Sequence, residues 1–231
     1  MHLNVASVAG FILCLGIIIT GIATNGGIGT IMNFIHVPSM LVTFGGALFA
    51  VMITSDSFAD YLDGLKSFPE AFHKVKLNED MISEQILEMS SIARKEGLLV
   101  LEERADGIES VFLLRSVFLK KGIRLIVDGT DPELVKDILE TELLQKEERI
   151  KKRIHFWEDL GAYAPAWGMV GTLLGLINMM RSMGTDAASI GSGMALALIT
   201  TLYGSVLANW VCIPISRRME KNGGQESLVM E

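Results

Sequence analysis

Cysteine is scarce in this chain of 231 residues, and acidic residues are missing from its most apolar segments. Cys14 and Cys212 each lie within an apolar run, so neither is placed for a disulfide or a metal site, and we interpret both as small hydrophobic residues. The apolar segments Gly161–Met180 and Ile190–Ile215 contain threonine and proline but no aspartate or glutamate. If an ion crosses there, the carboxylate that carries it must come from elsewhere.

The polar part of the chain, residues 56–159, lacks the motifs of common catalytic sites. It has no glycine-rich phosphate loop, no zinc-ligand spacing and no nucleophile elbow. We therefore expect a protein that is not an enzyme and that needs no cofactor. The net charge of −7 pools membrane and polar segments, so it argues only weakly against nucleic acid, which we do not expect as a partner.

Hydrophobic residues make up 50% of the chain and gather in stretches long enough to cross a bilayer as helices. Four such stretches stand out: Val5–Ala23, Ile35–Thr54, Gly161–Met180 and Ile190–Ile215. The sequence therefore predicts an all-α, four-span polytopic membrane protein with a helical cytoplasmic domain inserted between spans two and three. No Lys or Arg precedes the first stretch and its apolar core exceeds that of a signal peptide, so we interpret it as a membrane anchor.

The distribution of Lys and Arg predicts the orientation of the chain. Basic residues follow span two, precede span three and follow span four, whereas the linker Thr24–Phe34 has none. The positive-inside rule then places both termini and the insert in the cytoplasm. The expected domains are residues 1–54 with spans one and two, 55–159 as a cytoplasmic helical domain, 160–215 with spans three and four, and 216–231 as a cytoplasmic tail.

The insert has the periodicity of amphipathic helices. Ile82, Ile86, Met89 and Ala93 recur at three- and four-residue steps. The sequence Thr130-Asp131-Pro132-Glu133 is typical of a helix start, because it combines a capping side chain, an early proline and an early acid. We predict that a helix beginning here runs unbroken into span three.

The segment Arg94–Arg104 has basic residues at one end and acidic residues about two turns later. The more common explanation is a solvated helix face with ordinary intrahelical ion pairs. The alternative is a charged docking surface for a partner, where exposed charges set orientation and encounter rate. Gly97 is placed to end the helix between the two clusters and to display both.

The last two apolar segments carry polar and helix-bending residues at defined depths. At 1.5 Å per residue, Thr172 lies about 16 Å from the start of span three and Thr201 about 20 Å from the end of span four. Antiparallel helices would bring these hydroxyls side by side near the bilayer middle. Pro165 and Pro214 then lie toward the cytoplasmic side, where each permits a bend. The alternative is that each threonine bonds its own helix and each proline marks a helix end.

Small residues favour close packing of these two helices. They are Gly168, Gly171 and Gly175 on one helix, and Gly191, Gly193, Ala195 and Ala197 on the next. A conducting path built from helices without their own carboxylate suggests several copies of the chain around a partner helix that brings the titrating group.

Two strings of residues carry a resemblance to a known family: Tyr163-Ala164-Pro165-Ala166-Trp167-Gly168-Met169-Val170-Gly171-Thr172-Leu173-Leu174-Gly175 and Ala197-Leu198-Ile199-Thr200-Thr201-Leu202-Tyr203-Gly204. They resemble the MotA/PomA family of flagellar motor stator subunits and, more distantly, the ExbB and TolQ energisers. The resemblance covers the whole chain, including the order of two spans, an insert and two spans.

The resemblance implies a stator subunit that, with a MotB-type partner, conducts ions down their gradient and converts this into torque that drives flagellar rotation and motility. It implies a pentamer around two MotB helices in the bacterial inner membrane, with the ion-binding aspartate supplied by MotB. Residues matching the family's ion path are Thr172, Thr201, Pro165 and Pro214. Arg94 and Glu102 match the charges that the family uses to bind the rotor protein FliG.

The transported ion is not fixed by the sequence. Thr172 resembles the sodium-type PomA subunits, and threonine oxygens suit a dehydrated sodium ion, but a hydroxyl also suits a proton path. We favour the proton slightly and keep sodium as the alternative. An ExbB/TolQ-like energiser is a further alternative, although those proteins have one span before the insert where this chain has two. The remaining alternative is a structural scaffold that only binds partners.

Overall fold

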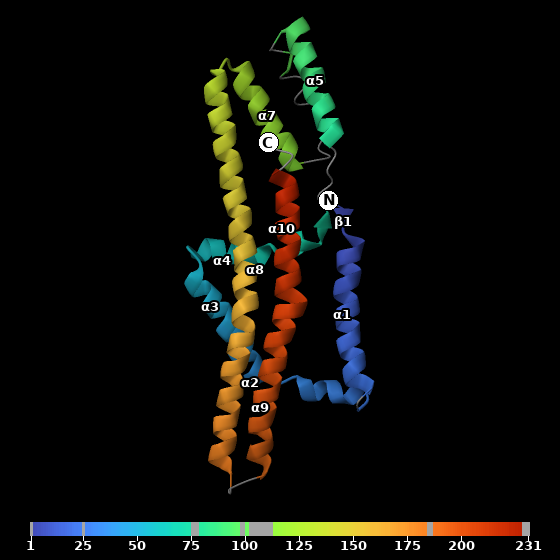
Figure 1. Ribbon diagram of the computed structural model, residues 1–231, viewed down its shortest axis with the longest axis vertical. Coiled ribbons are helices and arrows are strands. Elements are labelled where there is room, and N and C mark those ends of the chain that lie inside the picture. Colours follow the sequence, from blue (N-terminus) through green and yellow to red (C-terminus); the bar gives the residue numbers. More distant parts are fainter. Residues whose placement is uncertain are drawn as a thin grey trace. The chain divides into compact units, whose positions relative to one another are not determined.

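The computed structural model of the chain describes residues 2–24, 26–74, 79–97, 100–101, 113–183 and 187–227. Nearly all of these residues are helical (Figure 1). The chain divides into two compact units, which we describe separately. The membrane unit comprises Met1–Lys74 and Ile150–Asn222, and the polar unit comprises Val75–Arg149 and Gly223–Glu231. The predicted domain boundaries were placed at the ends of the apolar stretches, whereas these units are defined by compactness. The predicted boundaries therefore stay a prediction.

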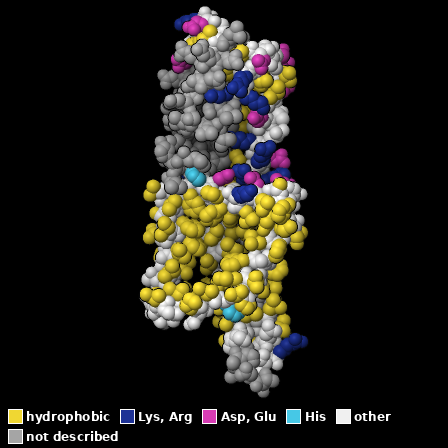
Figure 2. All heavy atoms as spheres, turned by 180° about the vertical axis from the view of Figure 1, so that it is seen from behind, with side chains coloured by type: hydrophobic (Ala, Val, Ile, Leu, Met, Phe, Trp, Pro, Cys, Tyr) yellow, Lys and Arg dark blue, Asp and Glu magenta, His cyan; other side chains and the backbone are white. Residues whose placement is uncertain are grey.

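Among the described residues, four helical segments are long and apolar enough to cross a membrane: Val5–Thr24, Val37–Thr54, one within Pro132–Ser182, and Ile190–Gly224. Figure 2 shows that hydrophobic side chains cover most of the visible surface of these segments. The predicted all-α fold with four spans is confirmed. The second span begins two residues later than predicted, because the chain is still extended at Ile35 and His36 and turns helical at Val37.

The first span, α1 (Val5–Thr24), begins at a capping residue and stands largely uncovered. The side chain of Asn4 accepts hydrogen bonds from the backbone N–H groups of Ala6 and Ser7, at 3.1 and 3.3 Å. Before it, the short strand β1 (His2–Leu3) pairs antiparallel with β2 (His73–Lys74). After it, the 3₁₀ helix η1 (Ile28–Phe34) leads toward span two.

Span two is one continuous helix with a π turn inside it. It comprises α2 (Val37–Met40), the π segment η2 (Leu41–Gly45) and α3 (Gly46–Thr54). Pro38 stands in the first turn, where its missing N–H costs no helix bond. A π turn inserts one extra residue into the helix and so changes which side chains face the neighbouring helix.

An amphipathic segment follows span two and packs against the start of span three. Ser57 caps α4 (Phe58–Lys66) by accepting from the N–H groups of Ala59 and Asp60, and the 3₁₀ helix η3 (Phe68–Phe72) comes next. The main core of the membrane unit lies here and includes Phe156 and Trp157. The indole N–H of Trp157 donates to the Ser67 hydroxyl at 3.0 Å.

Span three belongs to the 51-residue helix α8 (Pro132–Ser182). The Asp131 carboxylate accepts from the N–H of Glu133 at 2.9 Å, which caps the helix start. The helix begins at the proline and runs without interruption through Pro165. The predicted helix from this start into span three is confirmed.

Span four combines α9 (Ala187–Val206), the π segment η4 (Leu207–Cys212) and α10 (Ile213–Ser227). Pro214 is the second residue of α10, so one residue separates it from this π segment. A proline inside a helix has no N–H to donate and its ring crowds the preceding turn, so a wider turn just before it lets the helix continue. The predicted bend residue therefore lies inside a continuous helix.

The glycines of spans three and four allow their backbones to touch, as predicted. α8 and α9 run alongside one another within the membrane unit (Figure 1). A Cβ added at Gly193 would lie 2.8 Å from the carbonyl oxygen of Gly175, and one at Gly168 would lie 2.9 Å from the carbonyl oxygen of Thr200. Both distances are too short for any side chain.

The polar unit contains α5 (Glu79–Glu96), α7 (Leu113–Val127) and the first part of α8. Gly97 has φ 91° and its N–H bonds the Ala93 carbonyl at 3.1 Å, so it ends α5 as predicted. Gly129, with φ 73°, ends α7 in the same left-handed conformation, and the N–H of Thr130 reaches the Leu125 carbonyl at 3.1 Å.

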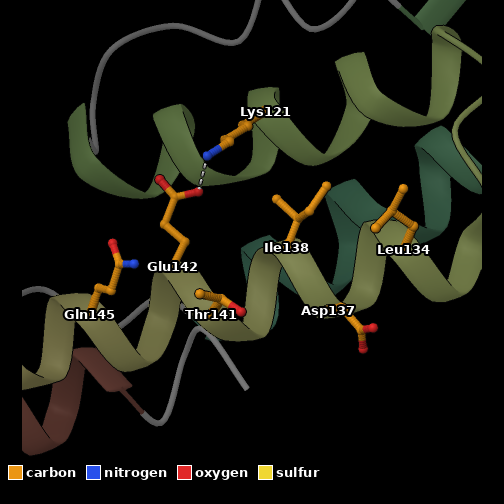
Figure 3. Close-up of a pocket in the computed structure, with 7 residues that line it drawn as sticks. All are labelled: Lys121, Leu134, Asp137, Ile138, Thr141, Glu142 and Gln145. Carbon is orange, nitrogen blue, oxygen red and sulfur yellow. Dashed lines mark hydrogen bonds and ion pairs between the residues drawn. The ribbon is translucent and has the colours of Figure 1, made fainter.

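An open hollow of about 480 Å³ lies between α7 and α8 in the polar unit (Figure 3). Its lining residues are Lys121, Leu134, Asp137, Ile138, Thr141, Glu142 and Gln145. Lys121 reaches across it to Glu142, with Nζ 2.5 Å from Oε2.

Candidate functional site

The two threonines predicted to lie side by side are in contact. The Oγ1 atoms of Thr172 on α8 and Thr201 on α9 are 2.5 Å apart. Thr172 is half-buried, whereas Thr201 is exposed in the single chain. The pair therefore presents hydroxyl oxygens at the surface of two apolar helices, where the lipid or another protein chain covers them.

Both hydroxyls also contact backbone carbonyls. Thr172 Oγ1 lies 3.1 Å from the Gly168 oxygen and 3.2 Å from the Ala197 oxygen, and Thr201 Oγ1 lies 3.2 Å from the same Ala197 oxygen. Both arrangements that the sequence allows therefore occur, because each threonine contacts a carbonyl of its own helix and also contacts the other threonine.

A third threonine, which the sequence analysis did not select, belongs to the same cluster. Thr200 is fully buried, and its Oγ1 lies 3.0 Å from the Ala197 carbonyl oxygen. Three hydroxyls thus surround one carbonyl oxygen that has two lone pairs. The three hydroxyls therefore do not all donate to this oxygen at once. Each hydroxyl oxygen also has lone pairs that can accept a hydrogen bond or contact a cation. The only sequence signal for Thr200 is its place beside Thr201.

The predicted prolines lie at different levels of the helix pair, because Pro165 packs opposite Gly204, where an added Cβ would lie 3.1 Å from the Cα of Pro165. A Cβ at Gly161, one turn before Pro165, would lie 3.2 Å from the Cβ of Cys212 and 3.7 Å from a side-chain carbon of Ile213. Ile213 is the neighbour of Pro214. Pro214 therefore lies near the level of Gly161, about one turn of α8 from Pro165, and Pro165 lies about two turns from Thr172.

The predicted rotor-binding charges are only partly within the structure. Arg94 is exposed in the last turn of α5. Glu102 lies outside the described residues, so the spatial relationship of the two charges stays a prediction.

A charged cluster joins α4 and η3 to α8. In the sequence, its basic residues served only to predict the orientation of the chain. Arg153 donates to Asp63 through Nε at 2.7 Å and through Nη2 at 3.1 Å, and its Nη1 reaches Glu70 at 2.8 Å. The hydrogen bond with Asp63 raises the pKa of Arg153. Lys152 lies 2.8 Å from Asp56, and this hydrogen bond lowers the pKa of Asp56. We call Asp56, Asp63, Glu70, Lys152 and Arg153 the Arg153 cluster.

The described residues contain no group of three or more His, Cys, Asp or Glu side chains that could hold a metal ion. Among the described residues, the contacts of the threonine pair are hydroxyl and carbonyl oxygens. Such a set can take part in moving a proton or a dehydrated cation only when another group supplies the negative charge.

Comparisons with known proteins find similarity over nearly the whole chain. Residues 112–231 match the family model described as the MotA/TolQ/ExbB proton channel family, and residues 8–97 match that of the motility protein A N-terminal region. Motility protein A of Aquifex aeolicus is 36% identical over 227 residues, covering 98% of this chain and 86% of that protein. Chemotaxis protein PomA of Vibrio alginolyticus is 35% identical over 98% of this chain and 84% of its own length.

A solved structure has the same fold. The structure of C. jejuni MotAB contains a chain that matches with a TM-score of 0.80 and 26% identity, covering 98% of this chain and 85% of that one.

Four candidate spans among the described residues, with a hydroxyl cluster between two of them, are those of an integral membrane protein. The chain belongs to the MotA/TolQ/ExbB proton channel family, on the branch whose N-terminal region is that of motility protein A. It is a multi-pass protein of the inner membrane.

Proposed function

We propose that this chain is a stator subunit of the bacterial flagellar motor, which conducts ions together with a MotB-type partner and converts their flow into torque on the rotor. The observation that carries the proposal is the contact between the Thr172 and Thr201 hydroxyls, within spans that hold no acid. Similarity to motility protein A and PomA over nearly the whole chain supports it.

The partner supplies the ion-binding aspartate in this proposal. Spans three and four have no charged residue between Gly161 and Met180 or between Ile190 and Ile215, so an ion at the level of the threonines meets hydroxyl and carbonyl oxygens alone. A carboxylate on an adjacent helix would balance the ion's charge there. The electrical part of the gradient supplies about 2.3 kcal/mol per charge for each 100 mV.

The exposed surfaces of the spans support assembly around that partner. Met169, Leu173 and Leu176 on α8 are 61%, 61% and 40% exposed, beside the exposed Thr201. A mixed surface of apolar side chains and hydroxyls suits contact with a protein helix, which can supply a further hydrogen-bonding group that lipid lacks. We propose a pentamer around two MotB-type helices.

Torque reaches the rotor through the polar unit. Both termini and this unit face the cytoplasm in the proposed orientation, and Arg94 with Glu102 contacts FliG. Exposure of Arg94 at the end of α5 supports the assignment, because a docking charge must be reachable. No nucleotide is needed, since the ion gradient supplies the energy.

The proton is the slightly favoured ion, and sodium is the alternative. The three threonine oxygens and the Ala197 carbonyl oxygen form a set that suits a dehydrated sodium ion, and the likeness to PomA is as high as that to the motility proteins A. A chain of hydroxyls serves a proton path equally well.

The test is swimming speed in a host without stators that carries this chain and its cognate MotB-type partner. Sodium is varied at fixed pH, and a protonophore is then added. Loss of swimming on sodium removal identifies a sodium stator, and insensitivity to sodium with loss under protonophore identifies a proton stator. Failure to swim in every condition, with membrane insertion verified, would overturn the proposed function.

A further inference from the structure

Span two and the residues just before it contact span four near the threonine pair through polar and aromatic contacts. The Tyr203 hydroxyl donates to the Phe34 carbonyl and accepts from the His36 N–H at 3.2 Å. The ring of Phe44 stacks on that of Tyr203, with centroids 5.4 Å apart. One helical turn away, the Thr43 hydroxyl donates to the Thr200 carbonyl oxygen at 3.3 Å.

Among the described threonines of the spans, Thr43 differs in that its hydroxyl has an acceptor in another helix and none in its own. A threonine in a membrane helix commonly donates to a carbonyl of its own preceding turn, as Thr20 does to Gly16 at 2.7 Å. Thr43 instead donates to another helix, and its side chain is fully buried. It stands at the centre of the π turn η2, which displaces it from the position that a regular helix would give it.

The acceptor of this bond belongs to the backbone of the site. The Thr200 carbonyl is part of the peptide group that joins Thr200 to Thr201, and Thr201 is the residue that meets Thr172. Gly168 of α8 packs onto the same carbonyl, where an added Cβ would lie 2.9 Å from the oxygen. Spans two and three thus hold this peptide from two sides.

We propose that Thr43 is a positioning residue of the ion path: its hydroxyl, presented by the π turn of span two, fixes the Thr200–Thr201 peptide and thereby keeps the Thr201 hydroxyl against Thr172. Thr43 does not touch the pair itself. The inference rests on the proposed function for its consequence in ion conduction, but its structural part can be measured without it.

The first experiment measures the threonine pair directly in the full chain in membranes. Thr172 and Thr201 are replaced by cysteine, Cys14 and Cys212 by alanine, and disulfide formation is followed after addition of copper phenanthroline as oxidant. Thr43→Val removes the donor while keeping the branched shape, and Thr43→Ser keeps the donor while losing a methyl group. Thr20→Val is the control that removes a hydroxyl bonded within its own helix.

Thr43→Val should slow cross-linking about threefold, which corresponds to the ~0.6 kcal/mol average for an interhelical hydrogen bond in a membrane protein. Thr43→Ser and Thr20→Val should leave the rate unchanged. Equal slowing by Thr43→Val and Thr43→Ser would show that packing rather than the hydrogen bond matters, and an unchanged rate in Thr43→Val would also overturn the proposal.

The second experiment measures the functional consequence with the natural threonines in place. Thr43→Val should raise the ion concentration for half-maximal swimming speed about threefold at unchanged membrane level, whereas Thr43→Ser should match the parent chain. If the parent chain itself fails to support swimming, the proposed function fails, and the cross-linking result still decides the role of Thr43. If the parent swims and Thr43→Val has the same ion requirement, positioning of the ion path by Thr43 is refuted.

Discussion

Arg153 on α8 holds Asp63 on α4 through two parallel hydrogen bonds, with Nε 2.7 Å from Oδ2 and Nη2 3.1 Å from Oδ1. The guanidinium uses its remaining edge on Glu70, at 2.8 Å. One side chain thus joins the segment after span two to the helix that leads into span three. A planar fork of donors is needed for this, and a lysine ammonium cannot reproduce it.

We expect Arg153→Gln to lower the stability of the membrane unit by about 1 kcal/mol, since the two carboxylates are nearly half exposed and solvent screens them. Arg153→Lys should recover only part of the loss, because it keeps the charge but not the two-point contact. Thermal unfolding in detergent measures both variants. A lysine variant as stable as the parent would show that charge alone matters.

The pair between Lys152 and Asp56 predicts a pH dependence whose sign follows from its pKa shifts. The hydrogen bond from Lys152 lowers the pKa of Asp56, so its contribution is present above the unfolded carboxyl pKa and is lost as pH falls through the folded one. The hydrogen bond with Asp56 raises the pKa of Lys152, so that contribution is lost only in strong alkali. The difference in melting temperature between the parent and Lys152→Met should be constant from about pH 5 to 9 and should shrink below about pH 4. A difference that changes around neutral pH would contradict this assignment.

Trp157 and Ser67 form a buried hydrogen bond, with the two residues 4% and 1% exposed. Ser67→Ala should destabilise the unit by roughly 1–3 kcal/mol, because it leaves the indole N–H buried without its acceptor. Trp157→Phe removes the donor as well as part of the ring. In a double-mutant cycle, Ser67→Ala should therefore cost less in the Trp157→Phe background. Additive effects would show that the hydrogen bond contributes nothing.

Gly175 and Gly191 offer a matched pair for testing the contact between spans three and four. An alanine Cβ at Gly175 would lie 2.5 Å from the Gly193 carbonyl oxygen, whereas one at Gly191 meets nothing within 4 Å. Gly175→Ala should cost roughly 1–3 kcal/mol, because backbone must move to admit it. Gly191→Ala should be neutral or slightly stabilising, because alanine favours the helix. Equal melting temperatures for the two variants would contradict the close contact.

The sequence predicts those parts of the fold that depend on local pattern. Apolar runs locate the four spans, the capping sequence before Pro132 locates the start of α8, and Gly97 locates the end of α5. The depths of Thr172 and Thr201 along two antiparallel helices correctly predict that their side chains meet. These signals are contained in short stretches of chain.

Other parts of the site depend on contacts between residues far apart in sequence. Arg153 and Asp63 are 90 residues apart, and Thr43 and the Thr200 carbonyl 157. Such partners follow from the packing of whole helices, which no local pattern encodes. The π turns are missed for a similar reason, because a π turn has the same apolar composition as the α-helix around it.

Arg94 and Lys136 allow the proposed rotor contact to be tested against a matched charge. Both are exposed in the polar unit, and Lys136 pairs only with Glu140 one turn away among the ion pairs of the described residues. Arg94→Glu should impair swimming while leaving membrane insertion intact, because it reverses a docking charge. Lys136→Glu should swim like the parent. Loss of insertion in Arg94→Glu would instead assign this residue a structural role.

Thr201 provides the sharpest test of the hydroxyl pair, because it is the exposed member. Thr201→Val removes the hydroxyl and keeps the shape, so we expect about a tenfold higher ion concentration for half-maximal swimming speed, equivalent to roughly 1.4 kcal/mol of lost ion stabilisation. Thr201→Ser keeps the hydroxyl and should stay close to the parent. Measured with Leu202→Val as a neighbouring apolar control, the two variants separate the chemistry of the hydroxyl from packing. If Thr201→Val and Thr201→Ser behave alike, the hydroxyl takes no part in ion passage and the path must be sought on another face of α9.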